Sequence, residues 1–165
     1  MILNSLDGAA IATRDAIVAR ARVIDTEWTE VVYDDPRGIT SSTDVLALAR
    51  ATNADFVCMV LVSDMSTDPA SDVGRALRQY EFLIVLAQVY GEGAGADELI
   101  GRAEKLENRM GSAPFTVTLG SDTFEMAVIG LDSAEPFSVI VDDNGGEVLG
   151  IIKALTLVTE IEVCP

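Results

Sequence analysis

The segment Leu77–Tyr90 reads LRQYEFLIVLAQVY and is the strongest strand candidate in the chain. Apolar side chains occupy both of its alternating sets of positions, which point to opposite faces of a sheet. The first set is Tyr80, Phe82, Ile84 and Leu86, and the second is Leu83, Val85, Ala87 and Val89. A strand of this kind is covered on both faces. We expect one cover to be a helix and the other to be a neighbouring subunit.

A glycine-rich loop and an amphipathic helix follow this strand. The loop, Gly91–Ala96, reads GEGAGA, and Asp97 and Glu98 then open a helix that runs to about Met110. One face of this helix is apolar; it carries Leu99, Ala103, Leu106 and Met110. Gly111 occupies the position of a C-terminal cap.

The N-terminal half of the chain has shorter patterns. We expect a helix over Ser5–Arg22, a strand over Glu27–Tyr33, and a short helix over Thr43–Thr52. The first helix would place near one face Leu6, Ala10, Ile17 and Ala21. Phe56–Val62 (FVCMVLV) is a buried strand candidate, and the polar segment Ser63–Asp72 is expected to be a loop.

The C-terminal third is predicted to be β-structure. The strand candidates are Phe115–Leu119, Thr123–Leu131, Phe137–Val141 and Val148–Val163. In the last of them, one alternating set is apolar and the other is acidic, which indicates a half-buried strand; the members are Leu155, Leu157, Ile161 and Val163 against Glu160 and Glu162. The element order predicts an α+β fold, with a mainly antiparallel β-sheet flanked by two to three helices. The length of 165 residues fits a single domain over residues 1–165.

Acidic residues outnumber basic ones by 27 to 11, which gives a formal net charge of −16. Affinity for nucleic acid comes mainly from lysine and arginine that neutralise phosphates, so this balance argues against a nucleic-acid-binding protein. It also argues against binding to an anionic membrane. A protein whose lumen lets DNA slide past is the exception, because a negative wall would repel the phosphates. The apolar fraction of 49% argues against disorder, and part of this surface could be buried between subunits.

Residues for common catalytic chemistry are missing. The sequence has no histidine, which removes the usual general base near neutral pH and the commonest metal ligand. Cys58 and Cys164 fit no zinc spacing, and Cys58 is expected to pack as a small hydrophobic residue. No Gly-x-Ser-x-Gly nucleophile motif occurs. We therefore expect a protein that is not an enzyme, with no catalytic residue and no cofactor.

Three segments match ligand sites only in part. Gly91–Ala96 satisfies the dinucleotide pattern G-x-G-x-x-A, but it lies in mid-chain without surrounding βαβ units, which favours a simple loop. Asp142–Glu147 holds oxygen ligands but lacks the spacing of a calcium loop, which favours a hairpin turn. Asp64, Asp68 and Asp72 could bind a divalent cation weakly, although a solvated acidic loop is the simpler interpretation. No metal site is predicted.

Two arginines stand out in this acidic chain. Arg75 and Arg78 lie where the expected loop passes into the strand candidate Leu77–Tyr90. They could donate ion pairs to acidic residues of a neighbouring subunit, or they could lie at a solvated strand end. Both interpretations remain open at this point.

The sequence shows no targeting segment. Asp7 stands where a basic region would begin a signal peptide. The apolar stretch Val148–Val163 is shorter than the roughly 20 residues of a membrane span and contains three charged residues. We expect the chain in the cytosol or in a particle that assembles there.

The order of elements resembles that of the tail terminator (tail completion) proteins of long-tailed bacteriophages. The most similar part is Gly74–Met110, GRALRQYEFLIVLAQVYGEGAGADELIGRAEKLENRM, in which an arginine-led apolar strand leads into an amphipathic helix that begins with aspartate. The resemblance covers element order and size over most of the chain and includes no diagnostic motif.

This resemblance implies a virion structural protein with a fold like those of tail terminator and tail tube subunits. Such a protein would form a homo-oligomeric ring, expected to be a hexamer, at the head-proximal end of the tail. It would end tail tube polymerisation and join the tail to the head connector, so its partners would be itself, the tail tube protein and the connector or stopper protein. DNA would pass through the ring without specific binding, and the protein would lie in the neck region of the virion after assembly in the host cytoplasm. Alternatives are another connector, neck or tail tube subunit, or a small acidic module that binds a metal or another ligand.

Overall fold

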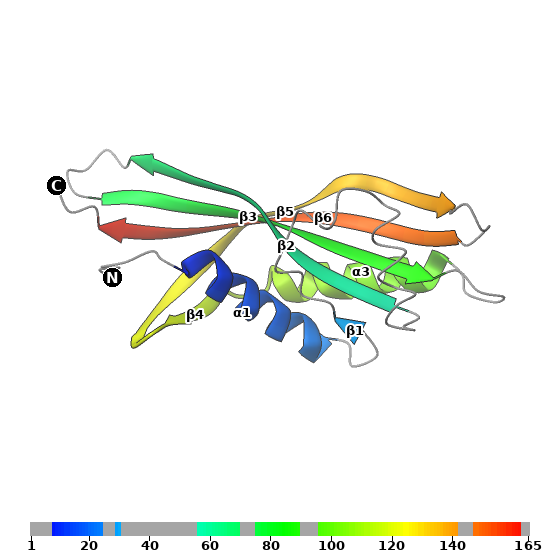
Figure 1. Cartoon of the computed structure of the whole chain (residues 1–165), viewed down its shortest axis with the longest axis horizontal. Helices are drawn as coiled ribbons and strands as arrows, with labels where there is room; N and C mark the ends of the chain where they lie inside the picture. Colours follow the sequence, from blue (N-terminus) through cyan, green and yellow to red (C-terminus); the bar gives the residue numbers. More distant parts are fainter. Residues whose placement is uncertain are drawn as a thin grey trace.

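The strand predicted over Leu77–Tyr90 lies in the middle of a curled sheet (Figure 1). The computed structural model describes residues 8–24, 29–30, 56–69, 75–89, 96–141 and 147–162. The described elements are α1 (Ala9–Ile24), β1 (Thr29–Glu30), β2 (Phe56–Pro69), β3 (Arg75–Val89), α3 (Ala96–Met110), β4 (Phe115–Leu119), β5 (Asp122–Val141) and β6 (Glu147–Glu162). None of the described helices is long and apolar enough to cross a membrane.

The strand order across the sheet is β1-β2-β3-β6-β5-β4. Strands β2, β3, β6 and β5 pair antiparallel along most of their length, whereas β1 pairs parallel with β2 at Val57 and Cys58. Both helices lie on the same side of the sheet (Figure 1). The chain therefore has the predicted α+β fold with a mainly antiparallel sheet, and the structure describes two flanking helices.

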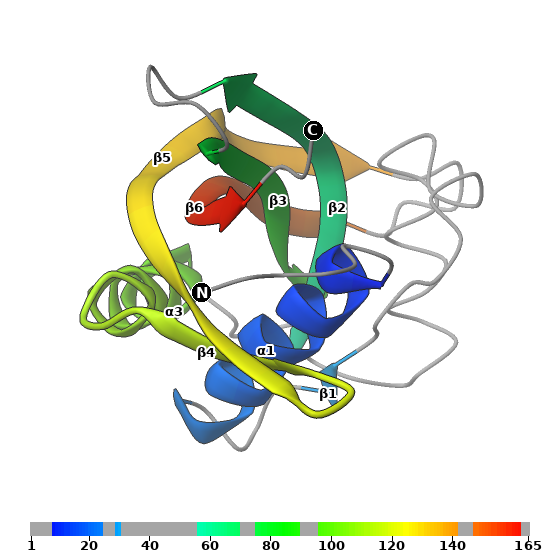
Figure 2. The ribbon, with the colours of Figure 1, turned by 90° about the vertical axis from the view of Figure 1, so that its left-hand side faces the viewer.

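Strand β5 gives the sheet its curl. Its first residues pair with β4, from Asp122 opposite Leu119 to Met126 opposite Phe115. From Ala127 onward it pairs with β6 instead, beginning opposite Val158. Figure 2 shows β5 sweeping from the β4 hairpin, beside α1, up into the main sheet. One long strand thus belongs to two parts of a half-barrel.

The core fills the space between the sheet and the helices. The sheet supplies alternating residues from neighbouring strands, because side chains two positions apart share a face. Cross-strand pairs such as Phe82 with Leu155 and Tyr80 with Leu157 are fully buried there. The remaining core residues of the strands include Cys58, Val60, Ile84, Leu86, Phe115, Val117, Phe124 and Met126. Cys58 is packed as predicted.

Helix α1 begins after Gly8, whose φ of +84° is easily reached only by glycine. The carbonyl of Gly8 accepts the first helical hydrogen bond from the amide of Ala12 (2.9 Å). Ile17 and Ala21 are buried, as the sequence predicted. The expected helix start at Ser5, with Leu6 near the same face, lies outside the described residues.

Helix α3 matches its prediction closely. All four residues of the predicted apolar face are buried, and the helix ends at Met110. Its end is capped by the hydroxyl of Ser112, which donates to the carbonyl of Arg109 (2.8 Å). Gly111 continues the helical pattern, since its amide donates to the carbonyl of Glu107 (3.1 Å).

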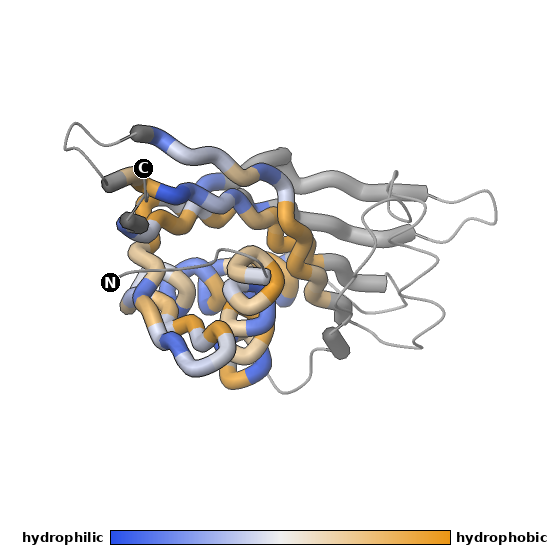
Figure 3. Tube along the Cα trace, turned by 60° about the vertical axis from the view of Figure 1, so that its left-hand side comes forward, coloured by the Kyte–Doolittle hydropathy of each residue, from blue (hydrophilic) through white to orange (hydrophobic). Residues whose placement is uncertain are grey.

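The loop predicted over Ser63–Asp72 is wrong in its first part, because β2 continues to Pro69. A bulge after Val62 shifts the register, and pairing with β3 then resumes with Asp64 opposite Glu81. The side chains of residues 63–68 are exposed on both faces, which explains their polar composition. Figure 3 shows this change along β2 from apolar (orange) to largely polar (blue and white).

The predicted break between Thr123–Leu131 and Phe137–Val141 is also wrong. Residues 122–141 form the single strand β5. The polar residues that suggested a break coincide with irregular pairing to β6, where the register shifts on either side of Glu135. Bulges let a strand keep its partner while it bends.

The central strand is buried on both faces at one end. Val85 and its cross-strand neighbour Met59 are buried on the face opposite the helices, whereas Leu77 is 43% exposed. The second cover, a neighbouring subunit, remains a prediction. The predicted helix Thr43–Thr52 and most of the predicted strand Glu27–Tyr33 lie outside the described residues.

Candidate assembly surface

The face of the sheet opposite α1 and α3, here called the outer face, carries no described helix (Figure 1). Side chains alternate between the two faces along a strand. Tyr80 and Phe82 of β3 point to the core, so the residues between and beside them point to the outer face. The register then places on the outer face Met59, Leu61, Asp64, Ser66, Asp68, Leu77, Gln79, Glu81, Leu83, Val85, Glu125, Ala127, Asp132, Thr156, Val158 and Glu160.

Every ionisable side chain described on the outer face is acidic. The acids are Asp64, Asp68, Glu81, Glu125, Asp132 and Glu160. Asp64 lies directly opposite Glu81, and like charges in this position destabilise a sheet. The pair therefore lowers the stability of the fold slightly.

Apart from Arg75, whose register position opposite Glu162 is on the outer face, the cations of the described elements lie elsewhere. Helix α1 carries Arg14, Arg20 and Arg22, helix α3 carries Arg102, Lys105 and Arg109, and the helix-facing side of the sheet carries Arg78 and Lys153. Lys153 reaches α3, where its ammonium group pairs with Glu107 at 3.1 Å. The two faces of the sheet therefore differ in charge.

The two arginines singled out in the sequence lie near the end of β3. Arg78 is half-buried on the helix-facing side, its Nη1 donates to the hydroxyl of Thr67 on β2, and its Cζ lies 5.3 Å from the ring centroid of Tyr80. Its Nε is buried and has no hydrogen-bond partner among the described residues. The backbone of Arg75 pairs opposite Glu162, and its side chain lies outside the described ones. Contacts of either arginine with another subunit remain a prediction.

Two strand edges are open in the described part of the chain. Strand β1 covers only Val57 and Cys58 of β2, so the edge from Met59 to Pro69 has no described partner strand. Strand β4 ends its pairing with β5 at Met126, which leaves the other edge of β5 open along Ala127–Val141. Unpaired edges of this length are templates for pairing with another chain.

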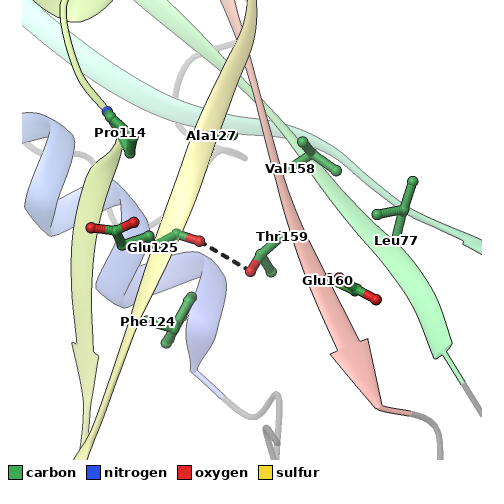
Figure 4. Close-up of a pocket in the computed structure, with 8 residues that line it drawn as sticks. All are labelled: Leu77, Pro114, Phe124, Glu125, Ala127, Val158, Thr159 and Glu160. Carbon is green, nitrogen blue, oxygen red and sulfur yellow. Dashed lines mark hydrogen bonds between the residues drawn. The ribbon is translucent and has the colours of Figure 1, made fainter. Parts of the chain in front are cut away.

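An open groove of about 560 Å³ lies where β5 leaves β6 (Figure 4). Its apolar lining consists of Leu77, Pro114, Phe124, Ala127 and Val158. The polar lining consists of Glu125, Thr159 and Glu160. The hydroxyl of Thr159 donates to the backbone carbonyl of Glu125 (3.1 Å) and so ties the two diverging strands together.

The partial ligand motifs of the sequence lie largely outside the described residues. In the described part of the chain, no three acidic or cysteine residues are grouped as a metal site. Asp64 and Asp68 lie along β2, and Asp72 lies outside the described residues, as do residues 91–95. Val141 pairs with Glu147, so the strands on either side of the predicted turn at 142–146 form a hairpin.

No protein-family model matches the sequence, and no curated protein matches it either. Among solved structures, a chain from the virion of a native gene transfer agent particle matches with 12% sequence identity and a TM-score of 0.41. The match covers 95% of this chain and 100% of the other.

Proposed function

We propose that this protein is a structural, non-catalytic subunit of a phage-like virion. In this proposal it forms a head-to-tail ring at the head-proximal end of the tail, ends tail tube polymerisation and joins the tail to the head connector. Its partners would be further copies of itself, the tail tube protein and the connector protein. It would act in the neck of the virion after assembly in the host cytoplasm.

The acidic outer face is the observation that carries this proposal. A ring whose channel is lined by this face would present mainly carboxylates to passing DNA, since Arg75 is the one cation of the described strands with a register position there. Phosphates bind proteins through lysine and arginine, so such a wall lets DNA move without being held. In this proposal, the like-charged pair Asp64–Glu81 helps to repel DNA phosphates, although it destabilises the sheet.

The open edges of β2 and β5 could pair between neighbouring subunits and so form the ring. Strands β2, β3, β6 and β5 alternate in direction, and the two open edges belong to the first and the last of them. If β2 of one subunit pairs with β5 of the next, the new contact is again antiparallel. The contact joins two different surfaces, so repeating it generates a ring when the rotation closes.

The resemblance of the sequence to tail terminator proteins supports the position in the virion. A tail tube subunit is the second candidate, because the same two edges would also serve a tube. A tube subunit would polymerise into open stacks of rings, whereas a terminator would stop at one ring.

Native mass measurement and electron microscopy of the purified protein test the proposal. We expect uniform rings with a central hole, near the mass of about 105 kDa for six copies of 17.5 kDa. Long tubes would favour the tail tube subunit instead. A protein that stays monomeric at high concentration and also fails to bind isolated tail tubes would contradict both candidates.

A further inference from the structure

Arg78 is bonded differently from the other buried or half-buried cations of the described elements. Each of the others has an acidic partner or several carbonyl partners: Arg14 pairs with Asp15, Arg102 with Glu98 and Lys153 with Glu107, and Arg20 donates to three backbone carbonyls. In the described part of the chain, no carboxylate lies within ion-pairing distance of Arg78, and its guanidinium donates to the hydroxyl of Thr67 instead.

This arrangement leaves part of the Arg78 side chain unsatisfied. Its Nε is buried and has no hydrogen-bond partner among the described residues. A buried polar group that has lost water without gaining a partner costs stability, and an arginine side chain stays charged in proteins. The described contacts of one subunit therefore leave the charge of Arg78 without a counter-charge beside it.

The guanidinium of Arg78 lies toward an open edge of the sheet. Arg78 is directly opposite Thr67 on β2, and its Nη1 reaches the hydroxyl of that threonine. Thr67 is exposed, and the far edge of β2 has no described partner strand from Met59 to Pro69. A strand added to this edge would lie about 4.8 Å from β2, so a side chain next to Thr67 on the helix-facing side would be within reach of the guanidinium.

A second copy of this chain is the best source of a carboxylate at this position. The chain has 27 acidic residues and 11 basic ones, so its own surface is rich in the required group. The proposed function already places β5 of the next copy along this edge. A basic partner protein would bring like charge toward Arg78, which disfavours association.

We propose that Arg78 binds a carboxylate of the neighbouring copy across the edge of β2 and so helps to join the two subunits. Nη1 bonds Thr67, and the remaining protons of Nη1 and Nη2 suit a carboxylate, which accepts guanidinium hydrogen bonds in pairs. That the neighbouring copy belongs to a ring rests on the proposed function. That Arg78 has room for a carboxylate partner rests on its described contacts.

Native mass measurement of the full chain over a range of concentrations tests this contact. Arg78→Met removes the guanidinium but keeps an unbranched side chain that can lie on the ring of Tyr80. We expect the concentration at which half of the subunits are assembled to rise about ten-fold, between the effects of losing an exposed and a buried charge contact. Lys105→Met makes the same change at an exposed site on α3 and should leave this concentration unchanged.

Urea unfolding of the dilute, monomeric variants separates assembly from folding. Arg78→Met should unfold at the same urea concentration as the unchanged chain, because loss of the bond to Thr67 is offset by removal of the unbonded Nε. A lower midpoint with unchanged assembly would show that Arg78 serves the fold alone, and the proposal would be wrong. Equal weakening of assembly by Lys105→Met would also overturn it.

The form of the assembly made by the unchanged chain tests the proposed function separately. Rings that form equally well from Arg78→Met would retain the ring and reject the contact. Open tubes or dimers that depend on Arg78 would retain the contact and reject a terminator ring. A chain that stays monomeric at every concentration would overturn the assignment of the carboxylate to a second copy.

Discussion

Arg20 joins α1 to the end of α3 and the start of β4. Its Nη1 donates to the carbonyls of Met110 (3.3 Å) and Ala113 (2.8 Å), and its Nη2 donates to that of Pro114 (2.6 Å). Its Cζ lies 3.5 Å from the centroid of the Phe115 ring. Desolvation by partial burial lowers the pKa of the Arg20 guanidinium below its ordinary value. The side chain therefore bonds the last carbonyl of α3, which the helix itself cannot satisfy, and two carbonyls of the segment that leads to β4.

Replacement of Arg20 should weaken the fold. We expect Arg20→Ala to lower the free energy of unfolding by about 1.5–3 kcal/mol, because hydrogen bonds from a charged donor are lost. Arg20→Lys should recover less than half of this, since lysine lacks the planar fork and the stacking surface. Urea unfolding measures both, with the exposed Lys105→Ala on α3 as the control. A lysine variant as stable as the original protein would contradict this role of Arg20.

Removal of the repulsion between Asp64 and Glu81 should stabilise the fold, in contrast to replacement of Arg20. Asp64→Asn should raise the free energy of unfolding by about 0.2–1 kcal/mol, because it removes a cross-strand repulsion. Asparagine can still accept the hydrogen bond that the amide of Met65 now donates to Asp64 (2.7 Å). Asp97→Asn makes the same change of charge in the first turn of α3, where a negative charge is favourable, and should be destabilising. Thermal or urea unfolding that shows the same sign for both variants would refute this reading of the outer face.

Among the elements, the β4–β5 hairpin depends on the backbone of one glycine. Gly120 has a φ of +64°, and a Cβ there would meet nothing within 4 Å, so any cost of substitution comes from the backbone. We expect Gly120→Ala to destabilise the protein by about 1–2 kcal/mol. Gly101→Ala, which is equally uncrowded but lies inside α3, should stabilise it by about 0.4–1 kcal/mol. Unfolding curves for the two variants should therefore move in opposite directions.

Strand β2 should control assembly without controlling the fold. Met65 lies in the exposed part of β2 and is 51% exposed. Met65→Lys should leave the circular dichroism spectrum unchanged but prevent ring formation, because a lysine on an edge strand blocks pairing with another chain. Ile100→Lys makes the same change at a site on α3 that is 43% exposed, and it should still form rings. Normal rings from Met65→Lys, seen by electron microscopy, would exclude β2 as the contact.

Local patterns predicted the elements that bury one clear face. The bounds of α3 and β4 and the buried set of α3 came directly from periodicity. The outer part of β2 was taken for a loop, because its residues are polar on both faces and its strand conformation depends on distant pairing with β3. Pairing with β6 likewise keeps β5 continuous through Pro136, which the local sequence indicated as a break.

For the whole molecule, the sequence predicted a negatively charged surface, but it could not predict on which face of the sheet the acidic residues lie. The excess of acids indicated a surface that repels DNA, but only the register of the sheet places Asp64, Glu81 and Glu160 on one face. The groove has no signal in the sequence, because it forms where β5 changes partner at Ala127. The open edges are likewise visible only once the strand order is known.

The most direct test of the proposed ring adds the purified protein to a growing tail tube of the same virion and measures tube length by electron microscopy. We predict a single ring at one end of each tube and lengths that stop increasing once the ring is bound. Tubes that continue to grow at both ends, or that incorporate the protein along their length, would contradict the account.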